Sequence, residues 1–122
     1  AMVRLIDFSL GYLDEHRDFI RMLADENAHG ARHLRDSDMA VRTNSPLLNL
    51  IAETLERGVA AGEFRAGVDP LELYVSIAGM TFFYFANGST MSAIFGRDLT
   101  RREAISSYRE HIVTLTMNGL RP

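Results

Sequence analysis

Apolar residues recur along most of the chain with the three- and four-residue spacing of helices. Residues 3–14 carry two such stripes that merge into one wide face, so a helix here needs neighbours on several sides. Residues 19–34 carry one apolar line opposite a polar line, which is typical of an amphipathic helix. No stretch indicates a strand above noise. The pattern therefore predicts an all-α fold.

The next helix is predicted to begin at Ser45 and Pro46, after a loop over residues 36–44. Serine can accept hydrogen bonds from the free N–H groups of a first turn, and proline fits the first helical position because the N–H it lacks would have no partner. The expected core line is Leu48, Ile51, Leu55 and Val59. Gly62 can adopt the left-handed conformation that stops a helix, so we expect the helix to run to about residue 61.

The clearest helix start lies at residues 68–73, where Asp69 can cap the free N–H groups and Pro70 fits the first turn. The predicted helix extends to about residue 87 and is apolar nearly all round, so it needs cover on two opposite sides. Gly88 is expected to end it, and residues 91–95 form at most a short helical turn.

The last helix is expected to start from a capping box over residues 99–103 and to end at residues 118–119. Its apolar line is Ile105, Tyr108, Ile112 and Leu115, with the spacing of a helix-pairing seam. These elements predict a bundle of five or six helices that forms a single domain over residues 1–122.

Composition excludes several classes of protein. The 122 residues include 13 basic and 16 acidic side chains, and a net charge of −3 argues against a phosphate-binding surface on this chain. The absence of cysteine excludes a disulfide scaffold, a thiolate zinc site and a cysteine nucleophile. The longest apolar stretch, residues 73–86, is shorter than the roughly 20 residues that span a membrane. With no signal-peptide pattern at the start, we expect a cytoplasmic chain without a membrane contact.

No set of catalytic residues emerges, since neither a Gly-x-Ser-x-Gly elbow nor a phosphate loop is present. We therefore expect no enzymatic activity and no cofactor. The alternative function is a metal-binding helical bundle, because helical spacing of four brings acidic and histidine side chains close enough to share a cation. The candidate ligands are Asp25, Glu26, His29 and His33. Solvated side chains explain this stripe better, since Asp25 and His29 fall on the polar line of their helix.

Four segments make the chain resemble the C-terminal domain of TetR-family transcriptional regulators. They are residues 16–23 (HRDFIRML), 62–70 (GEFRAGVDP), 77–80 (IAGM) and 117–120 (MNGL). The second segment, which opens a long apolar helix, is the most telling. The resemblance covers essentially the whole chain.

The resemblance implies an all-helical homodimer in which the last two helices of each subunit build a four-helix interface and the central helices enclose an effector pocket. It also implies a repressor that binds DNA only through an N-terminal helix-turn-helix, and no such segment is present in this chain.

An effector pocket is expected around Asn27, which lies on the apolar line of its helix, where a buried amide needs a partner and a ligand can be that partner. Aromatic neighbours with few polar anchors suit a small apolar or aromatic effector. The candidate ligand-binding residues are Phe8, Tyr12, Leu23, Asn27, Val75, Ala78, Phe82 and Phe85. For each residue singly, an ordinary core position is an equally good interpretation.

The other side of the apolar helix is assigned to a homodimer interface, since its small residues let a partner backbone approach closely. The candidate interface residues are Ser76, Gly79, Met80, Phe83, Ile105, Tyr108, Ile112 and Leu115. The alternative is that both sides are core within one chain. Five helices leave too few partners to cover every apolar face, which favours a homodimer.

Overall fold

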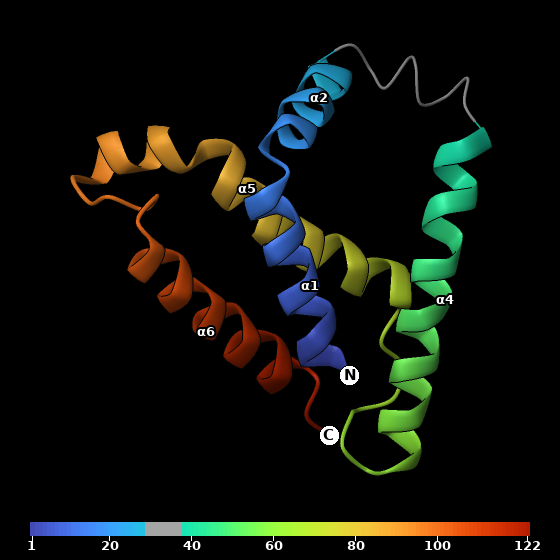
Figure 1. The fold of residues 1–122 in the computed structure, drawn as a ribbon. Coiled ribbons are helices and arrows are strands. Elements are labelled where there is room, and N and C mark those ends of the chain that lie inside the picture. Colours follow the sequence, from blue (N-terminus) through green and yellow to red (C-terminus); the bar gives the residue numbers. More distant parts are fainter. Residues whose placement is uncertain (29–37) are drawn as a thin grey trace.

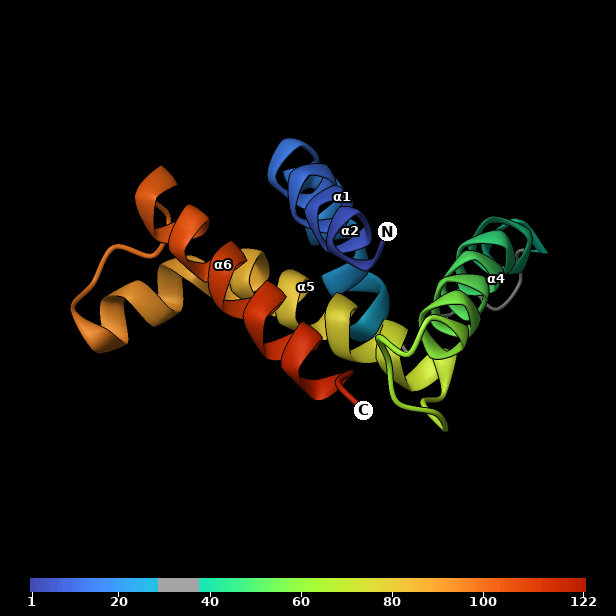
Figure 2. The same ribbon diagram turned by 90° about the horizontal axis from the view of Figure 1, so that it is seen from below.

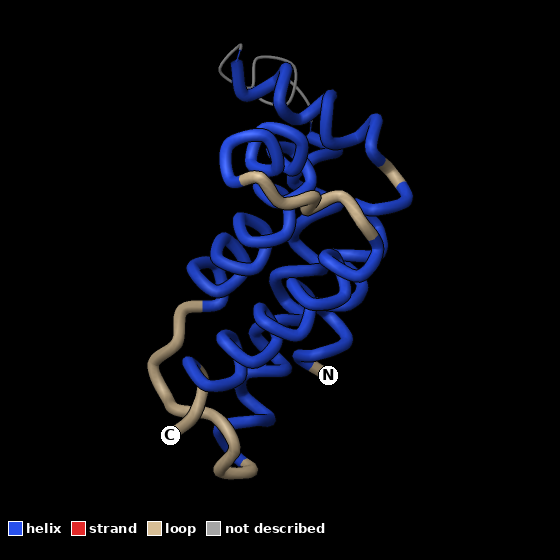
Figure 3. The backbone as a smooth tube through the Cα atoms, turned by 90° about the vertical axis from the view of Figure 1, so that its left-hand side faces the viewer, coloured by secondary structure: helices blue, strands red, loops and turns tan. Residues whose placement is uncertain are grey.

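The computed structural model describes residues 1–28 and 38–122, apart from the side chains of residues 23, 24, 27 and 38–45. The described part contains five helices and no strand, which confirms the all-α prediction. They are α1 (Met2–Glu15), α2 (Arg17–Ala28), α4 (Asp38–Ala60), α5 (Pro70–Phe95) and α6 (Arg102–Gly119). Figure 3 shows that the described connections between them are short loops.

Helix α5 is the element on which the others are arranged. It packs against α1, α2 and α4, and α1 packs in addition against α2 and α6. In Figures 1 and 2, α6 and α4 lie on opposite sides of α1. Both chain ends lie at the same end of the molecule (Figure 1).

The core forms between α1, α4, α5 and α6. Four residues of α1 are buried, and Ile6 is completely inaccessible to solvent. The core cluster consists of Met2, Ile6, Leu10, Ile51, Leu55, Phe64, Ile77, Ile112 and Leu120. Burial of one such side chain stabilises the fold by roughly 1.5–3 kcal/mol. Only one of the two stripes predicted for α1 is buried, because the second stripe leaves Phe8 67% exposed and Tyr12 38% exposed.

The start of α5 confirms the capping prediction. Asp69 Oδ1 accepts hydrogen bonds from the backbone N–H groups of Leu71, at 2.8 Å, and Glu72, at 3.4 Å. Pro70 occupies the first turn. Gly62 adopts a φ of +74° just after α4, as expected for a residue that ends a helix.

The predicted start of the third helix is wrong. Helix α4 begins at Asp38, so the expected loop over residues 36–44 is helical in its described part and Pro46 lies inside the helix. A proline in a helix interior removes one backbone hydrogen bond, and the turns on both sides keep theirs. A local Ser-Pro signal cannot distinguish this arrangement from a helix start. The second helix begins at Arg17 instead of Phe19, and its predicted end near residue 34 lies outside the described residues.

The predicted end of the fourth helix at Gly88 is also wrong, because α5 continues to Phe95 and ends at Gly96, with a φ of +66°. The Ser92 hydroxyl donates to the Gly88 carbonyl at 2.7 Å and accepts the Leu99 backbone N–H at 2.8 Å. These bonds fold the following loop back onto the helix. Gly88 is buried, and a Cβ added to it would lie 3.7 Å from the side chain of Thr100 in this loop.

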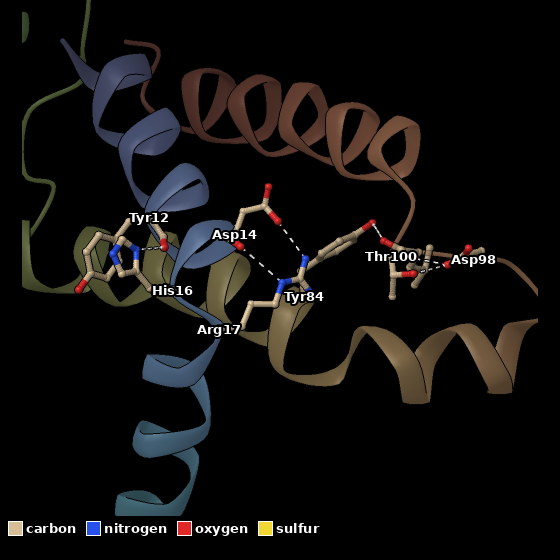
Figure 4. Close-up of polar contacts among 8 residues, drawn as sticks. Tyr12, Asp14, His16, Arg17, Tyr84, Asp98 and Thr100 are labelled. Carbon is tan, nitrogen blue, oxygen red and sulfur yellow. Dashed lines mark hydrogen bonds and ion pairs between the residues drawn. The ribbon is translucent and has the colours of Figure 1, made fainter.

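The predicted capping box before α6 does not form. Arg101 is the residue that precedes the helix, and its side chain makes no capping hydrogen bond. Thr100 instead turns toward Asp98, whose Oδ1 accepts from the Thr100 N–H at 2.9 Å and from its hydroxyl at 2.6 Å (Figure 4). These hydrogen bonds lower the pKa of the Asp98 carboxyl. The helix ends at Gly119, as expected.

Candidate functional site

The residues expected around a ligand are only partly brought together. Ala78, Phe82 and Phe85 are half-buried, whereas Val75 is 60% exposed on the outer face of α5. The side chains of Leu23 and Asn27 lie outside the described part. Three cavities lined by described residues, one at residues 96–107, one at the start of α5 and one at the start of α1, involve none of the eight candidates. The structure therefore places the described candidate side chains in separate groups instead of around one of these cavities.

One of these groups is a row of rings along α1 and the start of α2, here called the aromatic row: Phe8, Tyr12, His16 and Phe19. The Phe8 and Tyr12 rings are 6.1 Å apart between centroids and lie at 29° to each other. Tyr12 stacks on His16 at 4.1 Å and 14°, and Phe19 meets the Tyr12 ring edge-on at 5.6 Å. The prediction missed His16 and Phe19. The spacing of four from Phe8 to Tyr12 to His16 could have revealed the histidine.

A polar contact joins the end of α1 to the start of α2 and to α5. Arg17 donates to the Asp14 carboxylate at 2.9 Å, and its guanidinium carbon lies 5.3 Å from the centre of the Phe85 ring. Phe85 is thus covered by a cation, in an arrangement that aromatic faces favour. Figure 4 shows Asp14 and Arg17 on one side of α1 and the rings of Tyr12 and His16 on the other. The aromatic row is therefore clear of these polar contacts.

Two stacked tyrosines hold α6 onto α5. The Tyr84 and Tyr108 rings are 4.3 Å apart and nearly parallel. Tyr108 donates its hydroxyl to the Met80 carbonyl at 2.7 Å, and Tyr84 donates to the Leu99 carbonyl at 2.5 Å. Burial raises the pKa of both phenols. Tyr108 and Met80, both expected at a dimer interface, thus also contact each other within one chain.

Most of the predicted α6 seam lies against its own chain. Ile112 is 1% exposed, so it has no surface left for a partner and belongs to the core, contrary to the prediction. Ile105 and Tyr108 are half-buried, and only Leu115 is largely exposed, at 53%. Periodicity identified the apolar line correctly but not the neighbour it meets.

The predicted α5 residues, in contrast, do face outward. Ser76, Gly79 and Phe83 are exposed, and Phe83 keeps 54% of its surface accessible. Further exposed apolar side chains continue the same face at both ends. This α5 face consists of Leu71, Val75, Ser76, Gly79, Phe83 and Ile94. A helix with this much exposed apolar surface lacks a partner within its own described chain.

A cavity of about 590 Å³ adjoins the α5 face, between the start of α5, the end of α6 and residues 65–69. Ser76, Met80 and Leu115 contribute to its lining. The Thr116 hydroxyl beside it is buried and has no hydrogen-bond partner among the described residues. Arg65 and Gly119 also line the cavity, and Arg65 Nε donates to the Gly119 carbonyl at 2.9 Å.

The metal-binding alternative cannot be placed, because His29 and His33 lie outside the described residues. Asp25 is exposed and Glu26 is buried, and both take part in other interactions. Within residues 1–28 and 38–122, no three His, Cys, Asp or Glu side chains are grouped so that they could hold a metal ion. None of the described helices is both long enough and apolar enough to cross a bilayer.

Comparison with known proteins agrees with this architecture. The family model described as the tetracyclin repressor-like C-terminal domain matches residues 1–115. The HTH-type transcriptional repressor NicS of Pseudomonas putida is 30% identical over 121 residues, which are 99% of this chain and 57% of that protein. The chain thus spans little more than half the length of this relative. No solved structure matches the chain. The chain belongs to the TetR family of transcriptional regulators, in which it corresponds to the C-terminal domain.

Proposed function

We propose that this chain is the effector-sensing and homodimerising domain of a transcriptional repressor. Family membership and a relative named as a repressor support this role. The net charge of −3 supports the part of this proposal that gives DNA contact to another region of the regulator, because affinity for DNA comes mainly from neutralised phosphates. TetR-family proteins are regulators, and the proposal contains no catalytic step.

The observation that carries the dimer proposal is the α5 face. Leu71 is 54% exposed, Val75 60%, Phe83 54% and Ile94 62%, although all four are large apolar side chains on one helix. Such surface costs free energy in water, and a two-fold dimer would cover it with the same face of a second copy. Gly79 lies in the middle of the face, with nothing within 4 Å of where its Cβ would be. The partner helix can therefore approach the backbone closely there.

The proposed interface extends onto α6 only at its C-terminal half. Leu115 is 53% exposed and shares the adjoining cavity with Ser76, a residue of the α5 face. The rest of the predicted α6 seam is left out of the proposal because it already packs within the chain. The interface thus rests mainly on α5.

The experiment for this proposal is light scattering of the chain at micromolar concentration, with Phe83→Glu as the disrupting variant. The native chain should have twice the mass of 13.7 kDa. Phe83→Glu should raise the dimer Kd about 30-fold or more, as expected for a central aromatic interface residue. Phe8→Glu is the matched control, since Phe8 is also a largely exposed phenylalanine, at 67%, and lies on α1. A monomeric native chain, or equal dissociation of both variants, would refute the interface.

The aromatic row is the proposed effector face. Phe8 and Tyr12 expose apolar ring surface, which a planar apolar or aromatic ligand can cover. Helix α1 contacts α2, α5 and α6, so a ligand that favours one placement of α1 changes contacts with all three. The ligand shifts this equilibrium only by its difference in affinity for the two placements. A saturable rise in melting temperature with planar aromatic compounds, but not with their saturated-ring analogues, is the expected result.

A further inference from the structure

We infer that His16 is the polar anchor of the effector face and selects planar aromatic effectors that carry a hydrogen-bond donor. This inference rests on the proposed effector function of the aromatic row. It names the class of ligand, and it assigns the recognising atom to Nε2 of His16.

The backbone of α1 determines which ring nitrogen carries the proton. His16 Nδ1 lies 2.8 Å from the carbonyl oxygen of Tyr12, which is drawn as a dashed line in Figure 4. A carbonyl oxygen can only accept a hydrogen bond, so Nδ1 must be the donor. In the neutral ring the proton is then on Nδ1, and Nε2 is left as an acceptor. Within the described part of the chain, no residue provides a donor to this nitrogen.

Stacking holds the imidazole in place. The Tyr12 and His16 rings are 4.1 Å apart and within 14° of parallel, and Phe19 packs edge-on against Tyr12. Two contacts, one through the ring face and one through Nδ1, thus fix the orientation of a side chain that is otherwise exposed. An acceptor that is already oriented loses little conformational entropy when it binds a donor.

The rings of the aromatic row set the shape of the ligand. Tyr12 stacks directly on His16 and is 38% exposed, and Phe8, which follows Tyr12 along the row, is 67% exposed. A planar ring can cover this apolar surface while a hydroxyl or N–H group at its edge donates to Nε2. An aromatic compound without a donor would gain the ring contact alone.

The inference is tested by NMR titration of the chain with 4-hydroxybenzonitrile and 4-methylbenzonitrile, which differ only in a hydroxyl or a methyl group and carry no other hydrogen-bond donor. The hydroxyl compound should bind the native chain about fivefold more tightly, the contribution of one neutral hydrogen bond. In His16→Phe, which keeps a ring to stack on Tyr12, this ratio should fall to about one, while the affinity for the methyl compound stays within about threefold. His16→Gln, which returns an acceptor oxygen, should restore part of the preference.

The possible outcomes distinguish a failure of the inference about His16 from a failure of the proposed effector face. An unchanged ratio in His16→Phe would overturn the role of His16 and leave the effector face intact. If neither compound shifts the Phe8 and Tyr12 resonances at millimolar concentration, the effector face itself is refuted, and the inference with it. Nitrogen-15 spectra of the imidazole give a second test: a proton on Nδ1 is expected in the neutral ring, and a proton on Nε2 instead would contradict the assignment.

Discussion

Arg109 of α6 holds Asp7 of α1 through two parallel hydrogen bonds. The Nε–Oδ1 distance is 2.5 Å and the NH2–Oδ2 distance is 2.9 Å. Asp7 and Tyr12 are five positions apart on α1, about 140° around the helix at 3.6 residues per turn. The ion pair and the aromatic row thus lie on different faces of one helix. A ligand that displaces α1 through the aromatic row would also strain the contact with α6.

Replacement of Asp7 by asparagine should weaken the attachment of α1 to α6. Both side chains of the pair are about two fifths exposed, so solvent screens them and the effect should be modest. We expect a loss of roughly 1–4 °C in melting temperature, reduced further at high salt. The exchange Asp7→Arg with Arg109→Asp should recover most of the loss. If the double exchange is as destabilised as Asp7→Asn, charge pairing is not what connects these helices.

The same ion pair predicts a dependence on acid pH. Hydrogen bonding from Arg109 lowers the pKa of Asp7 below its ordinary value of 3.8, against a smaller opposing effect of burial. The stabilisation is therefore fully present above the ordinary pKa and is lost as the pH falls through the lower pKa of the folded state. The difference in melting temperature between the native chain and Asp7→Asn should be constant near neutral pH and shrink below about pH 4. A difference that grows in acid would contradict the sign of this shift.

The removal of a single oxygen atom should weaken the attachment of α6 to α5. Tyr108→Phe removes the hydroxyl that donates to the Met80 carbonyl and keeps the ring on Tyr84. The loss of one such hydrogen bond should cost about 1 kcal/mol in the free energy of unfolding. Tyr74→Phe is the control, since Tyr74 packs against the core and its hydroxyl makes no hydrogen bond among the described residues. Equal unfolding midpoints in urea for the two variants would show that the bond contributes nothing.

Two glycines of similar helical setting should respond in opposite directions to alanine. A Cβ at Gly58 of α4 would lie 2.0 Å from the Phe64 ring, so Gly58→Ala must displace that buried side chain. We expect a loss of about 1–3 kcal/mol in stability, the usual cost of overpacking. Gly11 of α1 has nothing within 4 Å, and Gly11→Ala should gain about 0.5–1 kcal/mol from helix propensity. Urea unfolding of both variants checks the pair, and a stabilised Gly58→Ala would contradict the packing.

Local signals predicted the parts of the fold that depend on a few neighbouring residues. The cap at Asp69 needs only the next three residues, and the left-handed turn at Gly62 needs only the glycine itself. The predicted helix ends that depend on contacts across a loop are wrong. Gly88 stays helical because Ser92 bonds both its carbonyl and Leu99. No pattern within one segment contains that information.

The candidate site, like the fold, could be predicted only in part from the sequence. Periodicity identified exposed Phe83 and buried Ile112 as members of apolar lines, but it could not tell which line meets a neighbour within the chain. The contribution of His16 depends on a ring orientation and a hydrogen bond to the Tyr12 carbonyl. Side-chain orientation of this kind is set by packing, and residue types alone do not determine it.

The central claim, a homodimer joined through α5, is tested most directly by isotope-filtered NOE spectroscopy on a mixture of labelled and unlabelled chains. We expect contacts between chains from Leu71, Val75, Phe83 and Ile94, which are exposed in the single chain, and none from Ile112, which is buried in it. Leu115 should show contacts at the edge of the interface. A spectrum without contacts between chains at millimolar concentration, or with contacts only from Phe8 and Tyr12, would contradict the account.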